Sequence, residues 1–250
     1  MTLARELADT AGRPQVDKNL LINGGMNVWQ RSTSATASST GYKTVDRFEY
    51  SQSGTAAYTQ SRSTDVPSGQ GFGYSMKMDV TTALASPAAS NYSMFMQKME
   101  GQNLQHLLKG TSSSKAVTLS FWVKSNKTGT YICELYDQDN SRHIDKSYTI
   151  NSASTWEKKT ITFDGDTSGV LDNDNGDSLN IIFWLGAGSD FTSGTLQTSW
   201  GSATNANRAV GQVNLADSTS NEWYVTGLML EVGSKATDFE FEPYDRTLQK

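Results

Sequence analysis

Alternating apolar and polar residues, separated by short turn clusters, constrain the fold of this chain more than any other sequence feature. Segments 117–124 and 160–163 are apolar at every second position. Residues two apart share one face of a β-strand, so this pattern predicts two strands that each turn one face to a core. The expected core set is Val117, Leu119, Phe121, Val123, Ile161 and Phe163.

Strand signals of this kind continue along most of the chain. Runs rich in Asn, Asp and Gly separate them, and such residues favour tight turns. This spacing is typical of an all-β fold, and we predict a β-sandwich of the jelly-roll type. Further candidate strands are 45–50, 74–80, 131–136 and 147–150, and the turn clusters are 126–129, 137–140 and 164–166.

A short helix is predicted at the N-terminus, over residues 2–11. Thr2 can cap it, and Gly12 followed by Pro14 ends it. Its apolar stripe is too small for an isolated helix, so it must dock either on its own domain or on a partner. We therefore divide the chain into an N-terminal anchoring segment, 1–18, and one sandwich domain, 19–250. The candidate residues for an attachment peg or an oligomer interface are Leu3, Leu7 and Ala11.

Charge and composition argue against several classes of function. The formal net charge is −5, and the Lys and Arg residues are scattered singly, so no basic patch for nucleic acid is expected. No run approaches the roughly 18 apolar residues that a membrane span needs, and no signal peptide is evident. The single cysteine, Cys133, allows no intrachain disulfide. The protein would therefore be made in a cytoplasm, and a virion protein released by lysis fits that combination.

No motif of a catalytic, metal or cofactor site stands out. His106 and His143 have no Cys or His partner at zinc-binding spacing. The acidic run 172–177 would place Leu171 at the first ligand position of an EF-hand loop, so we interpret it as an Asx-rich turn. We therefore expect no enzyme, cofactor or metal. A glycoside hydrolase with an unrecognised carboxylate pair is the least favoured alternative.

A long polar segment between Gly186 and Asn221 has few strand signals. Long loops in compact domains are usually functional or disordered. Its isolated large side chains are the predicted ligand-binding residues: Phe191, Trp200 and Arg208. Trp122 and Trp156 should lie opposite the core faces of their strands, where flat rings suit stacking on sugars. Cover by loops or by a neighbouring subunit is the alternative for both.

Two strands are apolar on both faces and must be covered on both sides. One is 181–185. In the other, 223–230, strict alternation puts Trp223, Val225 and Met229 on one side and Tyr224, Leu228 and Leu230 on the other. Loops or neighbouring subunits could provide the covers. Together with the small stripe of the N-terminal helix, these strands predict self-association.

Several segments resemble known protein groups. Residues 116–125, 154–163 and 221–233 resemble three strands of carbohydrate-binding-module-like jelly rolls. A second set resembles marine and cyanobacterial phage tail-fibre or virion structural proteins, and with it the likeness extends over residues 19–250. That set comprises 19–26, 29–31, 45–48, 97–104 and 239–244.

The resemblance implies a phage virion structural protein, either a tail fibre or a related tail or capsid-surface subunit. It implies a homotrimer, contacts with other virion proteins, and contact with a host receptor or glycan. The alternative is a free-standing carbohydrate-binding module of an enzyme. Thr226 stands where such modules often carry Asp, so the resemblance does not extend to a structural calcium site.

Overall fold

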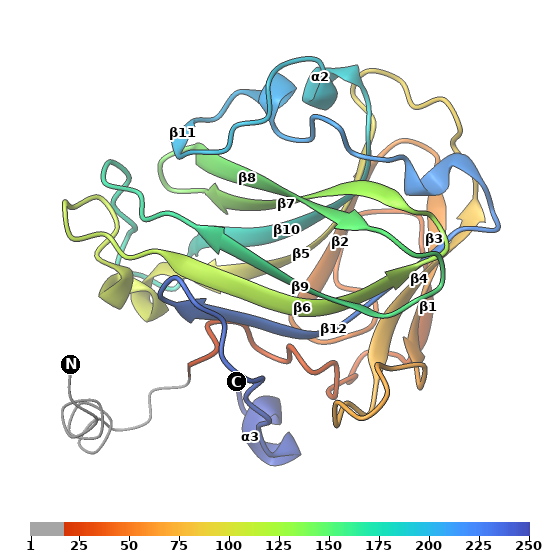
Figure 1. The fold of residues 1–250 in the computed structure, drawn as a ribbon, viewed down its shortest axis with the longest axis horizontal. Coiled ribbons are helices and arrows are strands. Elements are labelled where there is room, and N and C mark those ends of the chain that lie inside the picture. The colour runs from red at the N-terminus through yellow and green to blue at the C-terminus, as the bar shows by residue number, and fades with distance from the viewer. Residues whose placement is uncertain (1–17) are drawn as a thin grey trace.

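Two antiparallel sheets pack face to face in the computed structural model, which describes residues 18–250 (Figure 1). Each sheet has six strands, and the helices are short. The predicted all-β sandwich of the jelly-roll type is thereby confirmed. The expected helix over 2–11, with Leu3, Leu7 and Ala11, lies outside the described residues. Within them, no helix has the length and apolarity needed to cross a membrane.

Strands distant in sequence lie side by side in both sheets. The first sheet has the order β1 (Ser34–Ala37), β3 (Ala57–Ser63), β4 (Ser75–Thr82), β12 (Glu222–Val232), β6 (Val117–Ser125) and β9 (Glu157–Phe163). The second has the order β11 (Gly201–Ser202), β8 (Arg142–Ile150), β7 (Gly129–Asp137), β10 (Asp177–Ala187), β5 (Tyr92–Glu100) and β2 (Phe48–Ser53). The short helices are η1 (Gly101–Asn103), η2 (Gln105–Leu107), α2 (Ser189–Thr192), η3 (Asn205–Asn207), η4 (Leu215–Asp217) and α3 (Tyr244–Leu248).

The core between the sheets contains all six residues that alternation predicted. Phe121 and Phe163 are completely buried. The Phe121 ring meets Tyr148 and Phe183 edge-on, with both centroid distances 5.1 Å. Adjacent strands present the same face because Val117 pairs with Phe163 and Leu119 with Ile161. The local pattern therefore fixed both the strands and their register.

The outward face of β10 is covered by the chain itself. Its inward residues join the main core, whereas Ile182 and Trp184 belong to a second apolar cluster. Phe191 and Ala209 close this cluster from the segment that carries α2 and η3, which lies over the second sheet in Figure 1. We call residues 188–214 the cover segment. No neighbouring subunit is needed to bury this face.

The side chains of β12 do not alternate as the sequence predicted. A register shift lies between Thr226 and Met229, and Gly227 there has a φ of +64°. The irregularity reverses the parity, so Leu228 and Leu230 join Trp223 and Val225 in the core. The predicted grouping of Met229 with Trp223 is wrong for this reason: a bulge adds a residue to one strand.

The segment that precedes β1 is bound to β12 by backbone hydrogen bonds. Leu20 N donates to Leu230 O (2.8 Å), and Leu228 N donates to Gly24 O (3.0 Å). A Cβ at Gly24 would lie 2.0 Å from Leu228 O, so this close approach requires glycine. These contacts bring the start of the described chain beside β12, the last strand of the sandwich in sequence.

Candidate binding site

The three ligand-binding residues predicted in the long segment have packing roles. The Phe191 ring is 8% exposed and lies 5.4 Å from Trp184. The Arg208 guanidinium lies 5.2 Å from the same Trp184 ring. Trp200 packs elsewhere: its Nε1 donates to Asp164 O (2.6 Å), and Lys109 Nζ lies 4.4 Å from its ring centroid. Phe191 and Arg208 thus pack on the same Trp184 ring, whereas Trp200 lies apart from them. Ligand contact by any of the three stays a prediction.

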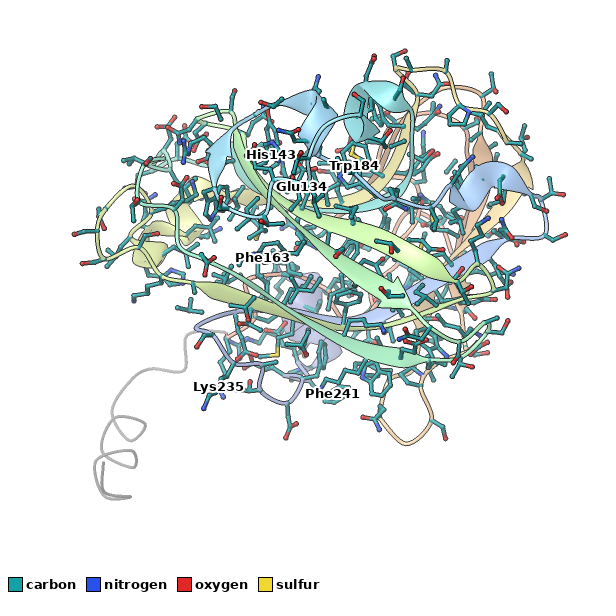
Figure 2. All side chains as sticks on the ribbon, turned by 45° about the horizontal axis from the view of Figure 1, so that its top comes forward. Glu134, His143, Phe163, Trp184, Lys235 and Phe241 are labelled. Carbon is teal, nitrogen blue, oxygen red and sulfur yellow. The ribbon has the colours of Figure 1, made fainter. Side chains whose placement is uncertain are left out.

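Arg208 reaches a buried polar cluster that sequence reasoning missed. Its Nε donates to Glu134 Oε1 (2.8 Å), and Trp184 Nε1 donates to Glu134 Oε2 (2.8 Å). Asp145 pairs across the strands with Glu134, and His143 Nδ1 lies 2.8 Å from Asp145 Oδ2. Figure 2 shows Glu134, His143 and Trp184 close together beneath the cover segment, apart from Phe163 in the core. Polar residues facing outward on β7 and β8 would ordinarily indicate solvent, so the sequence carried no signal of burial.

Burial perturbs the ionisation of this cluster. Burial and the nearby Glu134 charge raise the pKa of Asp145 to about 10. Burial and the Arg208 charge lower the pKa of His143 to about 4. Near neutral pH, Asp145 is therefore protonated and His143 is uncharged.

The spacing of these groups would suit a metal ion, but their hydrogen bonds do not. Ligand atoms of Glu134, His143 and Asp145 lie within 4.8 Å of one another. His143 Nε2 accepts from Thr204 N (3.3 Å), so the neutral ring carries its proton on Nδ1 and donates it to Asp145. Arg208 already neutralises Glu134. The side chains of Glu134, His143 and Asp145 are fully buried. The cluster therefore fastens the cover segment to the sheet and is closed to an external substrate.

A row of aromatic and cationic side chains crosses the outer face of the first sheet. It runs from Trp156, which directly precedes β9, over Lys124 of β6 and Tyr224 of β12 to Lys77 of β4. Lys124 Nζ lies 4.3 Å from the Tyr224 ring centroid, and the Trp156 and Tyr224 rings meet edge-on at 6.1 Å. Trp122 lies on the same face, opposite Thr226 and Lys158. We call these five residues, Trp122 included, the tryptophan face.

The loop between β3 and β4 covers part of the tryptophan face. Asp65 accepts a hydrogen bond from Trp156 Nε1 (2.8 Å) and forms an ion pair with Lys124. Tyr224 is consequently buried. Trp122 and Trp156 stay half-buried, outside the core as predicted, and exposed Lys158 borders Trp122. The exposed part is therefore a shallow surface of two indoles among polar side chains.

A second open feature is a cleft where the segments resembling phage proteins converge. Two adjoining cavities of about 350 and 390 Å³ share Ile22, Arg47, Lys98 and Lys250 in their walls. The Gln97 amide bonds both the N–H and the carbonyl of Ile22, each at 2.8 Å, and thereby joins the N-terminal segment to β5. We call this feature the Arg47 cleft.

Comparison with known proteins finds solved structures of similar fold, each with low sequence identity to this chain. No protein-family model matches it, and no curated protein matches its sequence. A tailspike enzymatically active domain of bacteriophage CBA120 is 14% identical with a TM-score of 0.46; the match covers 86% of this chain but 21% of that structure. A family 11 carbohydrate-binding module from Clostridium thermocellum, solved with a β-1,3-1,4-mixed-linked tetrasaccharide, is 15% identical with a TM-score of 0.40 and is covered to 98%, against 82% of this chain. Such likeness concerns the fold and assigns no ligand here.

Proposed function

We propose that this protein is a non-enzymatic, glycan-binding component of a phage virion, and that it contacts sugar through the tryptophan face. The observation that carries the glycan part is the pair of half-exposed indoles, Trp122 and Trp156, on the outer surface of a rigid sheet. Indole rings offer a large flat apolar area with little entropy to lose on binding. Trp122 lies within β6 and Trp156 directly precedes β9, and regular elements hold such rings in fixed positions.

The polar groups around the indoles suit hydroxylated ligands. Trp122 pairs with exposed Lys158 on one side, whereas Thr226 on the other side is buried and donates to Tyr74 O (2.8 Å). Trp156 Nε1 is already bonded to Asp65, which fixes the orientation of its ring. A sugar would place its apolar ring face on an indole and its hydroxyl groups against the exposed Lys158. The virion assignment, including a tail-fibre or capsid-surface role, rests on the sequence resemblance.

Glycan-array binding of purified variants tests the sugar part. Trp122→Ala and Trp156→Ala should each weaken binding about tenfold, which corresponds to about 1.4 kcal/mol. Val170→Ala, at an exposed apolar position elsewhere, is the matched control and should bind as the parent does. Trp200→Ala tests the predicted site in the long segment separately. It should bind as the parent does if sugar contacts the tryptophan face. Unchanged binding in both tryptophan-face variants would refute the proposed surface.

The virion part needs a different measurement. Mass spectrometry of purified virions should detect the protein in stoichiometric amounts. Its absence there, with retained glycan binding, would favour a free-standing carbohydrate-binding module of an enzyme. Hydrolysis of bound glycans by the purified protein would instead favour the glycoside hydrolase.

A further inference from the structure

The Arg47 cleft has the shape and lining of a small-molecule site. Each of its cavities is within the range of about 300–1,000 Å³ typical of ligand pockets. One lobe is lined by Gln30, Arg31 and Tyr42, and the other by Leu20, Met99 and Asn103. Apolar walls thus alternate with amide and cationic groups. Arg47 and Lys98 lie where the lobes meet.

Arg47 occupies a strained backbone conformation at this junction. Its φ is +73°, a region that costs roughly 1–2 kcal/mol for a residue with a Cβ. Both neighbours are fixed: Asp46 O accepts from Asn23 Nδ2 (3.1 Å), and the Phe48 ring stacks on Phe95 at 4.9 Å. Glycine would fit this position at less cost. Strain of this kind is concentrated at functional sites, where the side chain has a use.

The Arg47 guanidinium is exposed and available. Among residues 18–250 no side chain forms an ion pair or hydrogen bond with it. The other cations of the cleft have acidic partners: Arg31 NH1 lies 3.1 Å from Asp46 Oδ1, Lys98 Nζ lies 2.9 Å from Glu49 Oε2, and Lys250 forms an ion pair with Glu242. Those pairs fix the walls and leave Arg47 as the cation directed to a ligand.

Acids balance most of the positive charge in the cleft. Four cationic residues line the two cavities, Arg31, Arg47, Lys98 and Lys250, and the acids Asp46, Glu49 and Glu242 pair with three of them. Burial alone would lower the pKa of Lys98, but the hydrogen bond and charge of Glu49 raise it, so Lys98 stays charged. Arg47 is therefore the lining cation that no acid among residues 18–250 pairs, and an unpaired guanidinium in a cleft favours an anionic ligand.

We infer that the Arg47 cleft binds a carboxylate-bearing saccharide. The Arg47 guanidinium would hold the carboxylate in a bidentate pair. Tyr42, 40% exposed and fixed under Arg31 at 5.4 Å, would supply a flat wall for the sugar ring. The amides of Gln30 and Asn103 would meet hydroxyl groups. The choice of a saccharide rests on the proposed glycan binding, whereas the choice of an anion rests on this cleft.

Titration calorimetry of the full chain with D-glucuronate, N-acetylneuraminate, D-glucose and inorganic phosphate tests the inference. At least one of the two acidic sugars should bind more tightly than both glucose and phosphate, and the binding should weaken as salt is raised. Arg47→Gly should reduce that binding at least tenfold while keeping or raising the melting temperature, because glycine relieves the strain. Arg47→Lys should lose part of the affinity, since an ammonium cannot form the bidentate pair.

Controls separate this site from the tryptophan face. Arg62→Gly, at an exposed arginine over Tyr74, should leave acidic-sugar binding unchanged. Trp122→Ala and Trp156→Ala should also leave it unchanged, so failure of the proposed function and failure of this inference are distinguishable. Equal binding of phosphate would show a plain anion site and overturn the inference that the ligand is a saccharide. Equal binding of glucose, no binding of either acidic sugar, or full binding by Arg47→Gly would overturn the inference.

Discussion

At the scale of single residues, adjacent positions of one strand lie on opposite faces of the sheet. Phe121 is fully buried between the sheets, whereas Trp122 lies half-buried on the outer face. Phe121→Ala should lower the free energy of unfolding by about 3–5 kcal/mol, because it leaves a cavity among Tyr148 and Phe183. Trp122→Ala is the matched control and should cost clearly less in urea denaturation. Equal losses would show that the assigned face is wrong.

Asp145 provides a pH-dependent prediction at the same scale. Its raised pKa, about 10 in the fold against an ordinary 3.8, favours folding below pH 3.8 and loses this contribution as pH rises toward 10. The lowered pKa of His143, about 4, acts oppositely, favouring folding above 6.5 and losing that contribution as pH falls through 4. Between pH 6.5 and 10 Asp145 therefore dominates this pair, and the free energy of unfolding should fall by roughly 1 kcal/mol per pH unit.

Asp145→Asn should flatten that slope, since the amide does not titrate and keeps an oxygen for His143 Nδ1–H. Urea denaturation at a series of pH values from 6.5 to 9.5 measures it. Asp190→Asn, at an exposed carboxylate, should retain the parental slope. A slope unchanged by Asp145→Asn would show that this carboxyl is ionised in the fold.

At the scale of elements, the cover segment replaces the subunit contacts that the sequence suggested. Arg208 anchors it to Glu134, which is fully buried on β7. Arg208→Met should cost about 3–5 kcal/mol, because it leaves a buried charge without its partner. The double variant with Glu134→Gln should recover much of the loss, since the amide oxygen can still accept from Trp184. Arg62→Met is the control, and no recovery in the double variant would contradict the ion-pair account.

At the scale of the whole molecule, the homotrimer stays a prediction, and one of the sequence arguments for it no longer applies. Its remaining support is the stripe of Leu3, Leu7 and Ala11 and the resemblance to phage proteins, because the chain covers the outer face of β10 itself. Exposed apolar side chains gather near α3, namely Phe241, Tyr244 and Leu248. Lys18 N donates to Glu240 Oε2 (2.9 Å), so the described chain begins beside this patch.

Sedimentation velocity at micromolar concentration should show a trimer for the full chain. Deletion of residues 1–18 should weaken assembly and leave the sandwich folded, with its melting transition unchanged, because residues 19–250 contain the core between the sheets. Phe241→Asp should also weaken assembly if the patch near α3 is the interface. A folded full-length monomer, with no larger species as concentration rises, would contradict self-association of the isolated protein.

Alternation along the chain predicted the sandwich class and the core face of β6 and β9, because it is a local property that each strand carries alone. The cover over β10, the bulge at Gly227 that reverses β12, and the burial of Glu134 and Asp145 depend on contacts between distant segments. The tertiary structure also decided the Arg47 cleft, whose walls come from residues as far apart as Ile22, Lys98 and Lys250. Contacts across such distances depend on how the sheets and connecting segments pack, and no pattern of period two encodes that packing.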